Sequence, residues 1–317
     1  MAQPVPKKKD SALRIVSLLP SATEIVCVLG ARDQLVGVSH ECDHPPGVDQ
    51  LPVLTRPRFT LPERSDEIDR VVRKTLEDAL AVYEVDVDLL RELEPDVVVT
   101  QSLCDVCAVS LDDVRRALHE LARDDIEIVS LEPRRLGDVW RDILTVGDAL
   151  GRRGADVVAE IEQRCAAIAR RTTSISERPT VLTIEWLDPI MVGGTWMPEL
   201  VRLAGGEPLV TQPGEHAPTL SAEELVELDP DVVLVKPCGF DLARTRQEIE
   251  LLEHKLPSHW RASRLHRVYV ADGNAYFNRP GPRLVESLEI LAACVHPELF
   301  TDFEEKHAAS YFQYSTA

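Results

Sequence analysis

The feature of this sequence that most constrains its fold is an eight-residue motif that occurs twice. Residues 93–100 read Leu-Glu-Pro-Asp-Val-Val-Val-Thr, and residues 228–235 read Leu-Asp-Pro-Asp-Val-Val-Leu-Val. In each copy a helical pattern stops before a proline, and the apolar, largely β-branched run that follows predicts a buried parallel strand. A loop that carries cysteine comes next in both copies. The chain is therefore expected to consist of two similar α/β halves.

The same order of elements surrounds both copies of the motif. The first half has an expected strand at 14–19, a helix at 22–29 and a second strand at 35–38, and the second half has counterparts at 181–184, 198–203 and 209–210. We therefore expect an α/β fold of two Rossmann-like lobes with parallel sheets. Ligands of such sheets bind at the carboxyl ends of the strands, which predicts a ligand cleft between the lobes.

The chain length agrees with this division, since 317 residues suffice for two domains of about 150 residues each. An amphipathic pattern without proline predicts one long helix as the link between the lobes. The expected organisation is a flexible tail at 1–12, a first lobe at 13–150 with an insertion at 57–82, an interlobe helix at 151–176, a second lobe at 177–300 and a charged tail at 301–317.

The insertion contains an expected helix that begins at Ser65, which is a suitable N-cap residue followed by acidic residues. Two interpretations of this helix stay open. It either packs on the surface of the first lobe or covers the cleft as a lid.

The net charge of the chain limits the kinds of molecule that it can bind. A net charge of −19 argues against a nonspecific nucleic-acid or anionic-membrane surface, and no apolar run is long enough to cross a bilayer. The stretch after Lys7-Lys8-Lys9 contains Arg14 and Glu24 and supplies the first strand and helix, so we expect it to be retained and the protein to be cytoplasmic. The seven cysteines are then expected as thiols or metal ligands.

Several motifs together resemble a known family. They are the opening 15–24 (Ile-Val-Ser-Leu-Leu-Pro-Ser-Ala-Thr-Glu), Leu29-Gly30-Ala31, Leu35-Val36-Gly37-Val38, the two Pro-Asp-Val-Val steps and Arg267-Val268-Tyr269-Val270. This pattern resembles the helical-backbone (class III) substrate-binding proteins of ABC importers, and most closely their cobalamin-binding branch, over about residues 13–300. The resemblance implies two lobes joined by one long helix, a ligand in the cleft and little closure on binding. The class also includes siderophore, haem and metal binders.

The sequence departs from that family in three features: it lacks the expected export signal, it has an insertion around Ser65, and it contains additional cysteines. We therefore interpret it as a cytoplasmic offshoot of the family. Its protein partner is not indicated by the sequence. Cys104 and Cys107 have the spacing of a metal knuckle, and Cys42 and Cys238 each follow an expected strand. Four thiolates would suit zinc or an iron–sulfur cluster. The alternatives are small buried residues or a redox or covalent role for the thiols.

The candidate ligand-binding residues follow expected strands or lie in the loops beside them. Histidines in matching loops of the two lobes could approach a metal or a corrinoid cobalt, and aromatic residues could form a flat apolar wall. Core packing is the competing interpretation of the aromatic residues. The candidates are Pro20, Ser21, His40, Glu185, Trp186, Trp196, His216, Phe240, Asn274 and Tyr276.

Motifs of nucleophilic and phosphate chemistry are absent from the sequence. It contains no Gly-x-Ser-x-Gly, no Gly-x-x-x-x-Gly-Lys-Ser and no His-Glu-x-x-His. We therefore expect a binding protein rather than an enzyme, with a cobalamin or other corrinoid, or a related metal-bearing cofactor, as its small-molecule ligand. The alternative is a cytoplasmic metalloprotein or enzyme with a cysteine-rich zinc or iron–sulfur site in the cleft.

Overall fold

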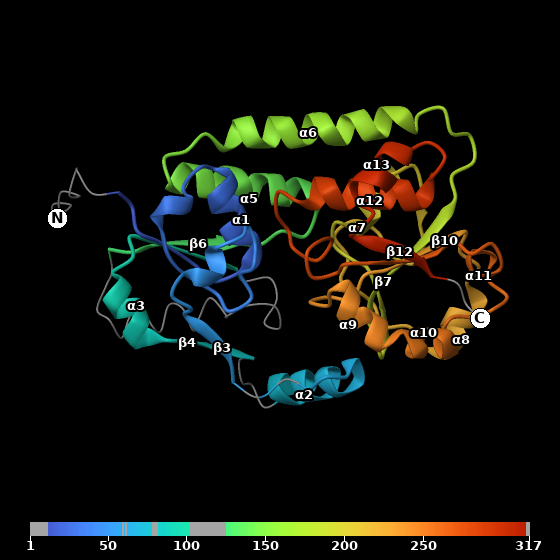
Figure 1. The fold of residues 1–317 in the computed structure, drawn as a ribbon, viewed down its shortest axis with the longest axis horizontal. Coiled ribbons are helices and arrows are strands. Elements are labelled where there is room, and N and C mark those ends of the chain that lie inside the picture. The colour runs from blue at the N-terminus through green and yellow to red at the C-terminus, as the bar shows by residue number, and fades with distance from the viewer. Residues whose placement is uncertain (1–11, 59, 61, 78–81, 102–124, 315–317) are drawn as a thin grey trace.

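The computed structural model describes residues 12–58, 60, 62–77, 82–101 and 125–314, which form two α/β lobes (Figure 1). The elements of the first lobe are β1 (Ile15–Ser17), α1 (Pro20–Val28), β2 (Leu35–Val38), β3 (Thr55–Pro57), α2 (Ser65–Glu77), β4 (Tyr83–Val85), α3 (Val87–Leu93), β5 (Val97–Gln101), β6 (Glu127–Leu131) and α5 (Leu136–Ala149), with 3-10 turns at Arg32–Gln34 and Val48–Gln50.

The helix α6 (Gly154–Arg171) leads to the second lobe. The elements of that lobe are β7 (Thr180–Leu187), β8 (Ile190–Val192), α7 (Met197–Leu203), β9 (Glu207–Pro208), α8 (Ala222–Glu227), β10 (Val232–Val235), α9 (Leu242–Gln247), α10 (Ile249–Lys255), α11 (Arg261–Arg264), β11 (Val268–Ala271), α12 (Leu284–Val295), α13 (Thr301–Lys306) and β12 (Tyr311–Tyr314).

The two sheets have equivalent strand orders. Four parallel strands of the first lobe lie in the order β2-β1-β5-β6, and four parallel strands of the second lie in the order β9-β7-β10-β11. The repeated Pro-Asp-Val-Val segments form the third strand of each order, β5 and β10. The α/β repeat predicted from the sequence is confirmed by this topology. The second sheet is extended by β8 and β12, which pair antiparallel with β7 and β11.

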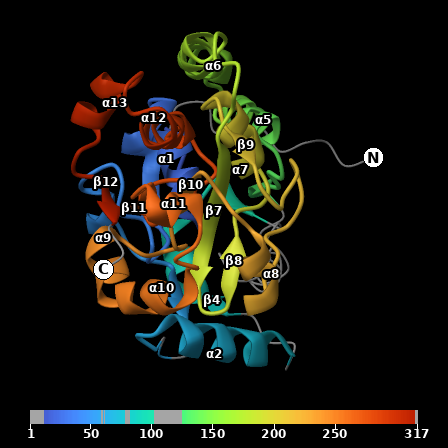
Figure 2. The same cartoon turned by 90° about the vertical axis from the view of Figure 1, so that its right-hand side faces the viewer.

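The helix α6 carries the chain from one lobe to the other, as predicted. It packs against α5 of the first lobe and α12 of the second (Figures 1 and 2). Its buried face consists of Val158, Ile161, Cys165 and Ile168, whose spacing places them on one side of a helix. These residues belong to one apolar cluster with residues of both lobes, so the link is part of the core.

The C-terminal segment differs from the prediction. A charged tail was expected at 301–317, but its described residues 301–314 form α13 and β12, and β12 pairs with β11 along four residues. Tyr314 is buried at the end of this strand, and Tyr311 packs beside Tyr269. The prediction is wrong because aromatic residues in this segment extend the apolar surface of the second lobe.

The expected strand at Leu209-Val210 also lies elsewhere. The strand β9 occupies Glu207–Pro208, and Val210 is 43% exposed with a φ of 74°. A β-branched side chain disfavours this left-handed backbone, so residue 210 belongs to a constrained loop.

The helix α2 lies on the side of the molecule opposite α6 (Figures 1 and 2). It starts at Ser65, which was predicted as its N-cap but is its first helical residue, since the Ile68 N–H donates to the backbone oxygen of Arg64. The helix contacts β7 of the second lobe. Among the described helices, none is long and apolar enough to cross a membrane.

Candidate functional site

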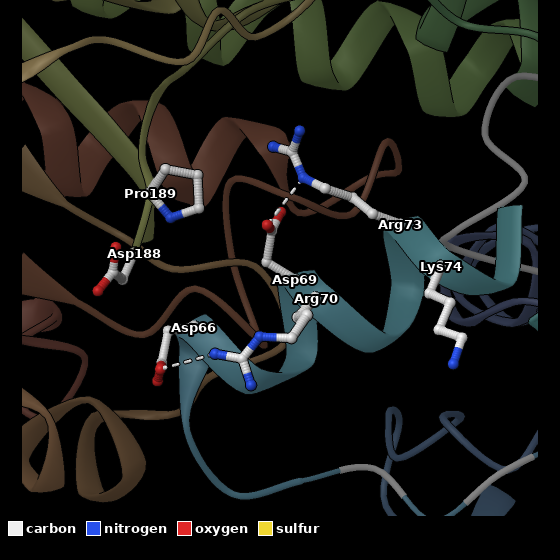
Figure 3. Close-up of a pocket in the computed structure, with 7 residues that line it drawn as sticks. All are labelled: Asp66, Asp69, Arg70, Arg73, Lys74, Asp188 and Pro189. Carbon is white, nitrogen blue, oxygen red and sulfur yellow. Dashed lines mark hydrogen bonds and ion pairs between the residues drawn. The ribbon is translucent and has the colours of Figure 1, made fainter. Parts of the chain in front are cut away.

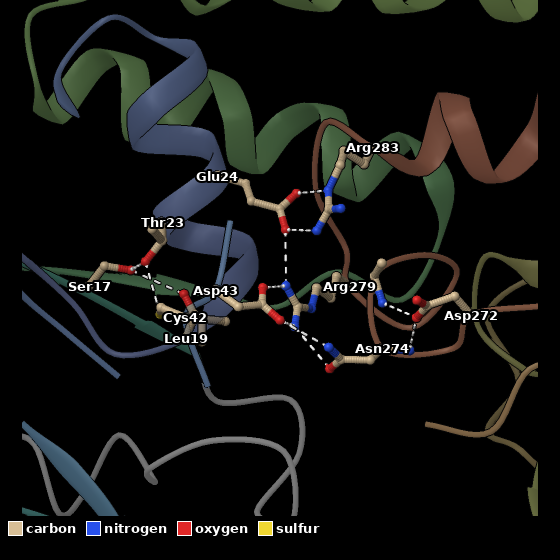
Figure 4. Close-up of polar contacts among 11 residues, drawn as sticks. Ser17, Leu19, Thr23, Glu24, Cys42, Asp43, Asp272, Asn274, Arg279 and Arg283 are labelled. Carbon is tan, nitrogen blue, oxygen red and sulfur yellow. Dashed lines mark hydrogen bonds and ion pairs between the residues drawn. The ribbon is translucent and has the colours of Figure 1, made fainter. Parts of the chain in front are cut away.

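The two lobes meet through loops at the carboxyl ends of their sheets. Asp43, in the loop after β2, accepts hydrogen bonds from Asn274 Nδ2 and Arg279 Nη2, both at 2.9 Å, in the loop after β11. Glu24 of α1 accepts hydrogen bonds from Arg283 Nε at 2.9 Å and Nη2 at 2.6 Å (Figure 4). We call these five residues the inner contact.

The inner contact is largely buried, with Asp43 at its half-exposed edge, and its charges support one another. Glu24 is 4% exposed and Arg279 is 8% exposed. Burial lowers the pKa of Arg279, but the carboxylates of Asp43 and Glu24 outweigh this effect and hold that pKa above its ordinary value. Burial raises the pKa of Asp43, but the hydrogen bonds and charge of Arg279 hold it below its ordinary value. Both lobes therefore contribute charges that are compensated only when the lobes are together.

The second lobe holds a fixed carboxylate beside an aromatic pair. Lys236 is fully buried, and its Nζ donates hydrogen bonds of 2.8 Å to Glu185 Oε2 and to Asn278 Oδ1. Glu185 lies where the pairing of β7 with β8 shifts register, an irregularity that redirects a side chain. The rings of Trp186 and Phe240 lie edge to face with centroids 5.3 Å apart. The structure thus brings together three predicted residues, Glu185, Trp186 and Phe240.

His40 in the first lobe has a fixed ring. Its Nδ1 lies 2.7 Å from Thr55 Oγ1, which also accepts a hydrogen bond from the His40 backbone N–H and donates one to Ser39 Oγ. Because a threonine hydroxyl has one proton and two acceptor positions, this arrangement assigns the proton to His40 Nδ1. Burial lowers the pKa of His40, so the imidazole is neutral at neutral pH. Tyr83 packs beside the ring with centroids 5.1 Å apart, and among the described residues no hydrogen bond uses His40 Nε2, which leaves this nitrogen able to accept a ligand.

A groove of about 600 Å³ separates α2 from the turn between β7 and β8 (Figure 3). Its lining includes five side chains from one face of α2, and Asp188 and Pro189 lie opposite them; the α2 residues are Asp66, Asp69, Arg70, Arg73 and Lys74. A second cavity of about 340 Å³ lies behind the inner contact, between α1, α6 and the start of α12.

The other candidate residues have varied surroundings. Trp196 is 7% exposed, belongs to the main apolar cluster and donates a 2.8 Å hydrogen bond to the backbone oxygen of Phe277, so its side chain is a core residue. His216 is exposed on a loop that packs against Gly194. The Arg283 guanidinium lies over the Tyr276 ring, with its Cζ 5.5 Å from the ring centroid.

Pro20 and Ser21 begin α1, and Ser21 is 2% exposed. The backbone of Gly281 in the second lobe lies close to Ser21. A Cβ atom built on Gly281 would be 3.5 Å from the Cβ atom of Ser21. The Oγ of Ser21 has no hydrogen-bond partner within the described parts of the chain. Ser21 therefore lies at the contact between the lobes.

The cysteines do not form a metal site in the described part of the chain, where no group of three or more histidine, cysteine, aspartate or glutamate side chains is arranged to hold a metal ion. Cys42 is buried, its Sγ lies 3.1 Å from Thr23 Oγ1, and burial raises the pKa of its thiol to about 11. Cys238 is exposed. Cys104 and Cys107 lie outside the described residues. For Cys42 this environment agrees with the alternative of a small buried residue.

The sequence did not indicate Glu24, Asp43, Arg279 and Arg283, which join the lobes, nor Lys236, which fixes Glu185 within the second lobe. One signal was available for Glu24. It is the only charged residue of α1, a helix whose remaining residues are apolar or small hydroxyl residues, and a charge in such a position requires a buried partner.

A family model and two curated relatives each match most of the chain. A family model described as Periplasmic binding protein matches residues 15–275. The chain is 24% identical to the uncharacterized ABC transporter substrate-binding lipoprotein YvrC of Bacillus subtilis (strain 168), over 93% of the chain and 83% of that protein. It is 19% identical to a vitamin B12-binding protein of Photorhabdus laumondii, over 88% of the chain and 86% of that protein.

A solved structure has the same fold. The chain superposes on a periplasmic heme binding protein from Pseudomonas aeruginosa with a TM-score of 0.68 and 22% identity, and the match covers 90% of the chain and 94% of that structure. The two-lobed architecture predicted from the sequence is therefore shared with a solved binding protein.

Proposed function

The chain belongs to the periplasmic binding protein family, whose members bind small molecules for ABC transporters, and on this premise we propose that its ligand is a cobalamin or another metal-bearing macrocycle. The ligand lies between the lobes, close to His40 on one side and to Trp186 and Phe240 on the other. An ABC transporter permease receives it.

Two kinds of relative support this class of ligand. One is named for vitamin B12 and the other for haem, and both ligands are flat macrocycles with a metal at the centre. Such ligands need an apolar wall, a metal-directed donor and a few polar groups at the periphery. The part-exposed indole of Trp186, backed by the buried ring of Phe240, supplies an apolar wall, and the carboxylate of Glu185, fixed by Lys236, supplies an acceptor for amide groups.

The observation that carries the proposal is the state of His40. A histidine that binds a metal is neutral, and its other ring nitrogen donates to a fixed acceptor that orients the ring. His40 meets both conditions, because its pKa is lowered and its Nδ1 is held by Thr55. Its Nε2 is therefore a suitable axial ligand for cobalt or iron.

Titration of the purified chain with cyanocobalamin and with haemin, followed by absorption, tests this assignment. We expect at least one probe to bind with a shift of its main absorption bands. His40→Ala should remove that shift, and Thr55→Val should weaken binding about tenfold because the ring loses its orienting partner.

His254→Ala is the matched control, since His254 is an exposed residue of α10. It should bind like the unchanged protein. A chain that binds neither probe contradicts the ligand class, whereas His40→Ala with an unchanged spectrum contradicts the axial role alone. The cytoplasmic location expected from the sequence stays a prediction, which fractionation of native cells would test.

A further inference from the structure

The helix α2 belongs to the first lobe in sequence, but its first residue is attached to the second. The backbone N–H of Ser65 donates to both carboxylate oxygens of Glu248, at 3.0 and 3.1 Å, and the Ser65 hydroxyl donates to Glu248 Oε2. Ser65 is fully buried and Glu248 is 9% exposed. We call this pair the latch. A carboxylate at the start of a helix satisfies a free N–H and complements the helix dipole, so Glu248 also stabilises α2 itself.

The rest of α2 is attached more loosely to the second lobe. Arg244 Nη2 donates to the backbone oxygen of Glu63, just before the helix. Along the groove, the charged residues of α2 pair with one another, as Asp66 with Arg70 and Asp69 with Arg73 (Figure 3). Within the described residues, no ion pair joins α2 to the second lobe. The latch is therefore the main polar attachment of the helix.

The lobes themselves are held on the other side of the molecule. The helix α6 passes between them without a break, and the inner contact joins them through buried charges. Separating the lobes would expose Glu24, Arg279 and Arg283 without their partners, which is costly. Moving α2 would uncover the Glu248 carboxylate and the polar groups of Ser65, which water can hydrate, and would also loosen the packing of Val72 on an apolar cluster of the first lobe.

We propose that Ser65 and Glu248 are positioning residues that hold α2 across the mouth of the ligand site as a removable wall, and that release of this latch, with the lobes in place, admits and frees the ligand. The role of the wall in ligand exchange rests on the proposed function. The attachment of α2 through Ser65 and Glu248 is independent of the proposed function.

Hydrogen exchange of the full chain without ligand tests the latch. Glu248→Ala should accelerate the exchange of amides in α2 about tenfold or more, since hydrogen bonds to a charged group are lost. Amides of α1 and α12 should keep their rates. Glu250→Ala, an exposed acid two residues further along, is the matched control and should leave α2 unchanged. Unchanged exchange in α2, or an equal acceleration in α1, α12 and α2, would overturn the proposal.

Ligand kinetics test the role of the wall. With cyanocobalamin or haemin bound, Glu248→Ala should release the probe about tenfold faster and also take it up faster, so the dissociation constant changes less than either rate. An unchanged release rate would refute the exchange step. If the unchanged protein binds neither probe, the proposed ligand class fails, and hydrogen exchange still decides on the latch.

Discussion

The inner contact and the latch join the same two lobes through carboxylates, but they differ in the group that each carboxylate contacts. In the inner contact, Glu24 and Asp43 face two guanidinium groups that share them. In the latch, Glu248 faces a neutral serine. A buried charge that loses a charged partner is strongly destabilised, whereas a serine is rehydrated at lower cost. From this difference we infer that the inner contact fixes the two lobes relative to each other, whereas the helix α2 can move away from the second lobe.

Removal of Arg279 should have the largest effect. Arg279→Met removes the buried cation that Asp43 and the buried Glu24 share, and we expect the free energy of unfolding to fall by about 3–5 kcal/mol. Urea denaturation measures this change. Arg264→Met is the control, because Arg264 is exposed, and it should change stability by less than about 0.5 kcal/mol. A loss at residue 279 as small as at residue 264 would show that the inner contact does not fix the lobes.

Acid should weaken the inner contact through Asp43. The pKa of this residue is lower in the folded protein than its ordinary value, so its contribution to stability is fully present above the ordinary value and is lost as the pH falls through the folded pKa. We expect the free energy of unfolding to fall below about pH 4. Asp43→Asn should start from a lower stability and show a smaller fall, as measured by denaturation across pH 2–6. Equal pH profiles for the two proteins would contradict the assignment to Asp43.

Removal of the serine hydroxyl from the latch should have a smaller effect than either change in the inner contact. Ser65→Ala keeps the backbone donor of the latch and should lower the free energy of unfolding by about 1 kcal/mol. Arg73→Gln, which breaks an exposed pair on the same helix, should cost less still, about 0.3–0.5 kcal/mol. If Ser65→Ala destabilises the chain as much as Arg279→Met, the distinction between the two contacts is wrong.

Local patterns in the sequence predicted the fold well. The two Pro-Asp-Val-Val segments are runs of apolar residues short enough to be strands, and both became the third strand of equivalent sheets. The apolar residues of α6 recur at helical spacing, so the helix that links the lobes could also be predicted. These features depend on neighbours in sequence, which is why a single chain reveals them.

The site was less predictable, because its contacts join distant residues. Glu24 and Arg283 are 259 residues apart, and Ser65 and Glu248 are 183 apart. Trp196 stands in a loop near the expected cleft, yet its indole N–H is used inside the core by the Phe277 backbone oxygen. His40 was found because it lies in a loop directly after β2, but the fixed orientation of its ring depends on Thr55, fifteen residues later.

The continuous helix α6 has a consequence for the strength that the latch requires. Two groups tethered in one molecule meet as if each were present at millimolar concentration or above, even when their attraction would not join separate molecules. Glu248 and Ser65 are tethered in this way, since α6 and the inner contact keep the lobes in register. The latch therefore has to hold only α2 in place and does not have to bring the two lobes together.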